Sequence, residues 1–177
     1  MLYQRSRQVL VSEDLKDMAS VDLVKDKAVR IILTGDVLFD SGKAALKPEA
    51  VESLRKIAGI LRETSFAVNV VGHTDDVPIS TEEFPSNWEL STMRACVTAR
   101  FLMDEVAIPP DQVYVTGHAE YQPVRDNTDP ESRAANRRVE IIMTKERPYG
   151  TLNASPGTNL NDRPRSGHDH IHSEDLR

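Results

Sequence analysis

The stretch VVGHTDDVPISTEEFPSNWELSTMRA, from Val70 to Ala95, contains the end of a strand, a long polar loop and the start of a helix. Residues 66–71 are rich in β-branched side chains and alternate with a period of two, which predicts a strand. Asp75 follows the carboxyl end of that strand, where a sheet with parallel neighbours usually meets its ligand. Ser86 and Glu89 have the spacing of a capping box, so a helix is expected to begin at Ser86.

Two stripes of side chains are expected along this helix. The core stripe is formed by Leu90, Met93, Val97 and Phe101. The stripe beside it is formed by Asn87, Ser91, Arg94 and Thr98. Arg94 therefore lies at the border of the buried face, and the stretch is expected to place its guanidinium near the carboxylate of Asp75.

The other elements follow from the same two periodicities. A hairpin is expected between 21–24 and 29–31. The first main strand is expected over 29–34 and then again through 37–39. Further elements are a helix at 48–62, a strand at 113–116, a turn or helix start at 128–131 and a last strand at 139–143. This order predicts an α/β sandwich: a mixed sheet with β-α-β-α-β-β order and helices packed on one face.

Composition is that of an ordinary globular domain with room for a core: 177 residues, 39% of them hydrophobic and 28% charged. A formal charge of −6 argues against a nucleic-acid partner, because such a surface favours a basic patch. Cys96 is the single cysteine, so no disulfide within the chain is expected. Residues 1–28 contain no apolar run long enough for a signal peptide or a membrane span.

Three blocks of sequence carry a family resemblance. They are Gly72–Asp75, Asn87–Ala95 and Asn136–Glu140. In this order they resemble the C-terminal domain of the OmpA/MotB family, a peptidoglycan-binding module, and the long insertion at 76–86 is similar to the MotB-like branch. The resemblance divides the chain into a partly ordered N-terminal extension (1–28), an OmpA-like domain (29–146) and a C-terminal tail (147–177) whose polar composition predicts disorder.

The resemblance implies a ligand, the meso-diaminopimelate side chain of a peptidoglycan stem peptide. Its ammonium would meet Asp75, and its carboxylate would meet the planar fork of Arg94. The binding residues implied are Asp75, Arg94, Thr74, Phe39, Asp40, Asn87, Leu90 and Ser91. From the residues alone, a structural salt bridge between Asp75 and Arg94 is equally well supported, and Asp40 is better explained as a turn former.

The function implied is non-catalytic attachment of an envelope protein or complex to the cell wall, in the periplasm and without a cofactor or metal. The alternative is the periplasmic part of a MotB-like flagellar stator subunit. The resemblance also leaves room for a homodimer and for a membrane partner protein.

A metal-dependent hydrolase is the competing class. Its ligands would be His73, Asp75, Asp76 and His118, since imidazoles and carboxylates at strand ends can bind zinc and activate water. The chain has no helical HExxH-like spacing to support it. His168, His170 and His172 alternate in the tail without a second cluster that would complete a metal site.

Overall fold

The computed structural model describes residues 18–24, 28–61 and 66–145, together with Tyr3, Gln4, Ser6, Gln8 and Leu15. These residues all belong to one compact unit, Met1–Arg147. The predicted tail and its three histidines lie outside the described residues. Within the described ranges, no helix is both long enough and apolar enough to cross a membrane.

A five-stranded sheet in the order β1-β2-β5-β3-β4 forms the centre of the fold. The strands are β1 (Ala19–Val24), β2 (Ala28–Thr34), β3 (Ala67–His73), β4 (Val113–Gly117) and β5 (Arg138–Thr144). Strands β3 and β4 pair in parallel, whereas the other neighbours are antiparallel. The sheet is therefore mixed, as the sequence predicts, and the expected hairpin of 21–24 with 29–31 is its first strand pair.

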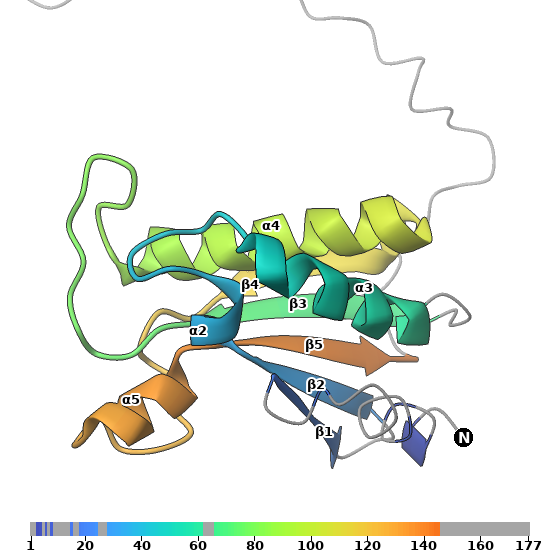
Figure 1. Cartoon of the computed structure of the whole chain (residues 1–177), viewed down its shortest axis with the longest axis horizontal. Coiled ribbons are helices and arrows are strands. Elements are labelled where there is room, and N and C mark those ends of the chain that lie inside the picture. Colours follow the sequence, from blue (N-terminus) through green and yellow to red (C-terminus); the bar gives the residue numbers. More distant parts are fainter. Residues whose placement is uncertain are drawn as a thin grey trace, which may run out of the picture. The chain divides into compact units, whose positions relative to one another are not determined.

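The helices are α2 (Gly35–Leu38), α3 (Pro48–Leu61), α4 (Asn87–Val106), the short 3-10 helix η2 (Pro110–Gln112) and α5 (Pro130–Asn136). Figure 1 shows α3 and α4 along the same face of the sheet, while α5 lies at the end where β5 begins. The predicted fold class, a mixed sheet with helices packed on one face, is confirmed.

The core lies between the sheet and the two long helices. Because side chains alternate along a strand, every second residue of the central strands points toward the helices. Aligned pairs of β2 and β5, such as Ile31 with Ile141 and Leu33 with Val139, present one apolar layer to them. The buried side chains of this layer and of α3 include Val29, Ile31, Leu33, Val68, Val70, Val139, Ile141, Met143, Leu54, Ile57 and Leu61. Each full burial of such a side chain stabilises the fold by about 1.5–3 kcal/mol.

The prediction that the first strand resumes over 37–39 is wrong for residues 37 and 38, which belong to the one-turn helix α2. Phe39 is extended and forms an isolated antiparallel bridge with Leu46. Gly35 lies against the backbone that enters β5: its N–H donates to the carbonyl oxygen of Arg137 at 2.8 Å, and a Cβ on Gly35 would lie 2.6 Å from that oxygen. The chain turns away from the sheet at this contact. Leu38 and Phe39 remain buried, as their apolar character requires.

The prediction of the core stripe along α4 is also wrong in part, because Met93 is 45% exposed. The most deeply buried residues of this helix are instead Leu90, Ser91, Arg94, Ala95, Thr98, Ala99 and Leu102. Two glycines of the sheet explain the shift: a Cβ on Gly72 would lie 2.0 Å from the carbonyl oxygen of Ser91, and one on Gly117 would lie 2.1 Å from Oγ1 of Thr92. The helix backbone therefore lies directly on β3 and β4, and small residues form the contact.

The predicted capping pair at the start of α4 is present. The hydroxyl of Ser86 accepts a hydrogen bond from the N–H of Trp88 at 3.2 Å and donates to the carboxylate of Glu89. The start of α4, and hence the position of Asn87 and Arg94, is fixed by this local contact.

The close approach of α4 to β3 predicts a specific sensitivity. Gly72→Ala should lower the free energy of unfolding by about 1–3 kcal/mol or more, because the new methyl group overlaps the backbone of Ser91. Gly59→Ala is the matched control: nothing lies within 4 Å of its added Cβ, and in a helix it should stabilise by about 0.5–1 kcal/mol. Chemical denaturation of both variants measures this, and equal stabilities would contradict the packing described.

Candidate functional site

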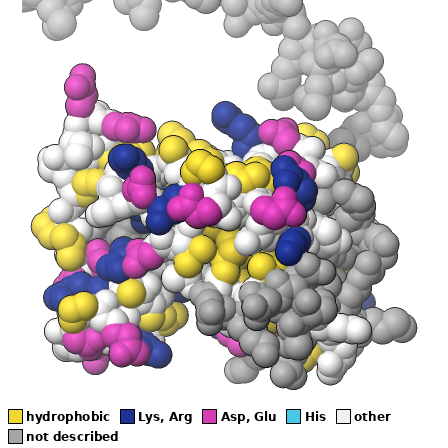
Figure 2. All heavy atoms as spheres, viewed as in Figure 1, with side chains coloured by type: hydrophobic (Ala, Val, Ile, Leu, Met, Phe, Trp, Pro, Cys, Tyr) yellow, Lys and Arg dark blue, Asp and Glu magenta, His cyan; other side chains and the backbone are white. Residues whose placement is uncertain are grey.

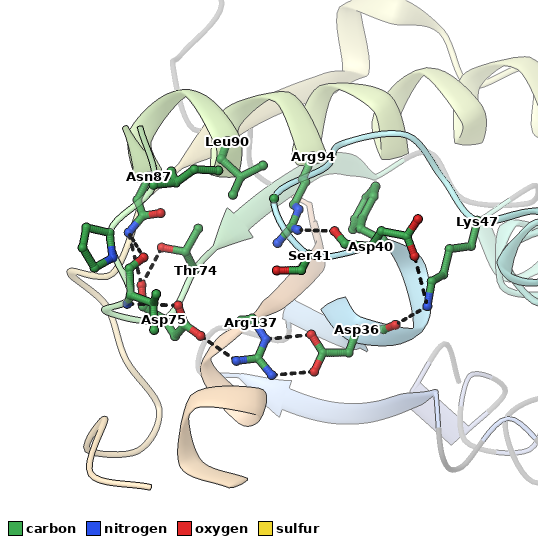
Figure 3. A pocket seen from close by; sticks show the side chains of 15 residues that line it. Asp36, Asp40, Ser41, Lys47, Thr74, Asp75, Asn87, Leu90, Arg94 and Arg137 are labelled. Atoms are coloured by element: carbon green, nitrogen blue, oxygen red, sulfur yellow. Dashed lines mark hydrogen bonds and ion pairs between the residues drawn. The ribbon is translucent and has the colours of Figure 1, made fainter. Parts of the chain in front are cut away.

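A pocket of about 670 Å³ opens beside the carboxyl end of β3. Figure 3 shows that its walls come from α2, the loop after it, the loop after β3, the first turns of α4, and Arg137. Of the eight residues that the sequence predicts, seven line it: Phe39, Asp40, Thr74, Asp75, Asn87, Leu90 and Arg94. The other lining residues are Asp36, Ser41, Gly42, Lys47, Val77, Pro78, Ile79 and Arg137.

The carboxylate of Asp75 is held at the pocket by two donors. Its Oδ1 accepts the backbone N–H of Val77 at 3.1 Å, and its Oδ2 accepts Nη1 of Arg137 at 2.5 Å. The residue is only 7% exposed. Each carboxylate oxygen has two lone pairs, so Asp75 retains acceptor capacity for a further donor in the pocket.

The guanidinium of Arg94 lies on the opposite side of the pocket, and it does not pair with Asp75. It stacks over the ring of Phe39, 5.1 Å from the ring centroid, and donates to the carbonyl oxygens of Lys43 at 2.9 Å and Asp40 at 3.1 Å. Among the described residues, no carboxylate lies within ion-pair distance of it. The structural salt bridge between Asp75 and Arg94 is therefore absent, and Arg94 is a 5%-exposed cation whose direct partners are neutral.

Burial lowers the pKa of Arg94 from its usual value, and the nearby carboxylates of Asp36 and Asp75 oppose that shift. A guanidinium remains protonated in proteins, so the side chain keeps its charge. Removing a cation from water without pairing it is costly. The geometry therefore leaves an unbalanced positive charge that an anionic ligand group would stabilise.

Arg137 and Asp36 are the residues that the sequence analysis missed. Arg137 binds the carboxylate of Asp36 through two parallel hydrogen bonds, at 2.7 and 2.6 Å, and uses its third nitrogen for Asp75. The hydrogen bonds between these two side chains lower the pKa of Asp36 and raise the pKa of Arg137. Arg137 belongs to one of the three family-like blocks, which could have marked it, whereas nothing in the local pattern marks Asp36.

Asp40 contributes to the site through its backbone. Its carbonyl oxygen accepts from Arg94, while its half-exposed carboxylate faces the amino groups of Lys43 at 3.5 Å and Lys47 at 3.8 Å. The N–H of Lys43 donates to the same carbonyl, and Gly42 has the left-handed φ of 67° that this turn requires. The turn former that the sequence favours is thus present, and the turn aims carbonyl groups at Arg94.

Asn87 and Thr74 organise the pocket floor. The side-chain amide of Asn87 donates to the carbonyl oxygens of Val77 at 3.1 Å and Asp75 at 3.4 Å, and the Thr74 hydroxyl donates to the carbonyl of Asp75 at 2.9 Å. Both side chains are buried. They fix the backbone that carries Asp75.

Ser91 lies outside the pocket. It is fully buried, its hydroxyl donates to the carbonyl oxygen of Trp88 at 3.1 Å, and it accepts the N–H of Ala119 at 3.1 Å. It thus joins α4 to the turn after β4 rather than facing a ligand.

The 76–86 insertion forms one wall. Phe84 is buried in a small cluster with Ala44 and Leu90, and Ile79 packs against it. This cluster holds the insertion against the loop after α2. Val77, Pro78 and Ile79 also line the pocket and add apolar surface to it.

The residues that the metal-dependent hydrolase would need do not form a metal site among the described residues. Among the described residues, no group of three His, Cys, Asp or Glu side chains is placed to hold a metal ion. Asp76 pairs with Arg133 at 2.9 Å, and His73 stacks on His118 with ring centroids 5.5 Å apart. Burial, together with the charge of Arg138, lowers the pKa of His73 to about 3.

The OmpA family model matches residues 38–137, and the chain belongs to the OmpA family. It is 36% identical over 114 residues to Motility protein B of Bacillus subtilis, an alignment covering 64% of this chain and 44% of that protein. The chain spans about half the length of the curated relatives it matches first.

Two solved structures share the fold. One is a MotB-like protein from Desulfovibrio vulgaris, with a TM-score of 0.76 and 28% identity over 82% of this chain and 90% of that one. The other is the cell wall anchor of the T6SS from Pseudomonas aeruginosa, with a TM-score of 0.74 and 33% identity over 81% and 99% of the two chains. The predicted relationship to the OmpA-like domain and its MotB-like members is confirmed.

The buried imidazole of His73 predicts a pH dependence of stability. Since its pKa is about 3 in the folded protein and about 6.5 when unfolded, only the unfolded state takes up this proton between those values, and stability falls as pH falls below 6.5. The loss at pH 5 is about 2 kcal/mol relative to pH 7.5. Chemical denaturation of the unmodified chain and of His73→Gln at both pH values checks this. The free energy of unfolding of the unmodified chain should fall by about 2 kcal/mol more than that of the variant, and equal losses would contradict a buried neutral imidazole.

Proposed function

We propose that this chain is a non-catalytic peptidoglycan-binding domain of the bacterial cell envelope, and that its pocket takes the diaminopimelate side chain of a stem peptide. The observation that carries the proposal is the separation of charges in the pocket. A carboxylate with spare acceptor capacity, Asp75, faces it from one side, and a cation without a carboxylate partner, Arg94, faces it from the other.

A zwitterionic end group complements this arrangement. The free end of meso-diaminopimelate carries an ammonium, which would donate to Asp75, and a carboxylate, which would accept from the N–H groups of Arg94 not used for Lys43 and Asp40. The methylene chain between them would lie against the apolar side formed by Val77 and Ile79. No bond is made or broken in this account.

Family membership supports the same function. The chain is similar to a cell wall anchor and to MotB-like proteins, which points to attachment of an envelope protein or complex to the wall on the periplasmic side. The similarity to Motility protein B favours a second candidate, the periplasmic part of a flagellar stator subunit. That candidate uses the same pocket and differs only in what is attached.

The proposal predicts capture of diaminopimelate-type murein sacculi without metal. The chain should co-sediment with sacculi equally well in EDTA, because no step needs a cation. Asp75→Asn should weaken binding about ten- to hundredfold. This factor corresponds to the loss of one hydrogen bond between charged groups, which contributes about 1.5–3 kcal/mol.

Asp76→Asn is the matched control. Asp76 is the neighbouring residue, its carboxylate pairs with Arg133, and it does not line the pocket. Binding should be retained in this variant. Recovery of the unmodified chain in the supernatant with and without sacculi would refute the proposed function, and equal loss in both variants would refute the role of Asp75.

A second prediction concerns the wall type. Lysine-type peptidoglycan lacks the terminal carboxylate, so Arg94 would have no ligand partner and affinity should fall about ten- to hundredfold. Comparing two ligands on one protein avoids the stability change expected of Arg94 variants. Loss of this guanidinium would remove the side-chain donor to the Lys43 carbonyl and one of the two donors to the Asp40 carbonyl. Equal affinity for the two walls would show that Arg94 does not read the carboxylate.

A further inference from the structure

Two exposed aromatic rings, those of Trp88 and Tyr121, lie side by side. Trp88 is 47% exposed and Tyr121 is 65% exposed, and their rings stack with centroids 5.4 Å apart and planes 24° from parallel. Large aromatic side chains are usually buried because they carry so much apolar area. A stacked pair left open to water is therefore a candidate binding surface.

The pair is tied to the pocket through the backbone. Trp88 follows Asn87, which lines the pocket, in the first turn of α4. Tyr121 belongs to the turn after β4, whose Ala119 accepts the N–H of Thr74 at 2.9 Å and donates its own N–H to Ser91 at 3.1 Å. The same short contacts that position the pocket floor thus position both rings.

The surface beside Trp88 is mainly apolar. A hollow of about 310 Å³ beside Trp88 is also lined by Glu89, Thr92, Met93 and Cys96. The rings themselves supply the hydrogen-bonding groups, since the indole N–H of Trp88 and the hydroxyl of Tyr121 lie at the edges of flat apolar faces. Sugar rings have the complementary character, because their C–H faces pack on aromatic rings while their hydroxyl edges require polar partners.

From this arrangement we infer that Trp88 and Tyr121 form a saccharide-binding surface, which takes the glycan strand to which the bound stem peptide is attached. This inference rests on the proposed function, since a stem peptide held in the pocket brings its covalently attached amino sugar to the neighbouring surface. The rings bind the sugar by stacking and are not needed for the peptide. A second copy of the chain is the competing occupant.

The test compares a free stem tripeptide ending in meso-diaminopimelate with the same tripeptide attached to its N-acetylglucosamine–N-acetylmuramic acid disaccharide. Trp88 is the single tryptophan of the chain, so intrinsic fluorescence reports directly on this surface. The disaccharide form should bind about two- to tenfold more tightly, as expected for aromatic stacking, and should change the Trp88 emission. The free tripeptide should bind without that change.

Tyr121→Ala and Trp88→Ala should remove the added affinity of the disaccharide form and leave the affinity for the free tripeptide unchanged. Leu23→Ala is the control, since Leu23 is 60% exposed and lies on β1, at the other edge of the sheet from β4. It should alter neither affinity.

Four outcomes would overturn the inference. If the tripeptide binds and the disaccharide adds nothing, the saccharide surface is wrong while the proposed function stands. If neither ligand binds, both are wrong. If the aromatic variants weaken both ligands equally, the rings act only through the fold. If sedimentation shows a dimer that Tyr121→Ala abolishes, the surface serves a second copy instead.

Discussion

The site depends on one guanidinium, that of Arg137. It grips Asp36 with two hydrogen bonds across 101 residues of sequence and Asp75 with a third across 62 residues. It thereby joins α2, the end of β3 and the beginning of β5 at the edge of one pocket. The side chain is 28% exposed, so the ion pairs contribute modestly to stability. Their main consequence is geometric, because they orient the carboxylate of Asp75.

Arg94 is the counterpart of this arrangement. Its neighbours are the ring of Phe39 and carbonyl oxygens, so it is oriented without being neutralised. The pocket contains three carboxylates and three cations among its described side chains, yet their pairing is uneven: Arg137 is shared by two carboxylates and Arg94 has none. Figure 2 shows that acidic and basic side chains are interspersed over the face it displays.

Most of the fold could be predicted from the sequence, because period-two and helical patterns reflect contacts that are local or shared by a whole face. The strands, α3 and the start of α4 follow in this way, and so does the placement of Asp75 and Arg94 around one space. The failures involve contacts between distant segments. Residues 37–39 are apolar enough for a strand, but the chain leaves the sheet where Gly35 packs against the backbone of Arg137. Met93 fits the core stripe by its spacing, but the close packing of α4 on Gly72 places Ser91 against the sheet instead. The partnership of Arg137 with Asp36 leaves no periodic signal at all.

The most direct test of this account is a crystal structure of the chain with the meso-diaminopimelate tripeptide bound. The account predicts that the ligand ammonium lies about 3 Å from the carboxylate of Asp75, that the ligand carboxylate is held by Arg94, and that Arg137 still grips Asp36. A bound ligand whose carboxylate is taken by Arg137 or Lys47, with Arg94 keeping only the carbonyls of Lys43 and Asp40, would contradict it.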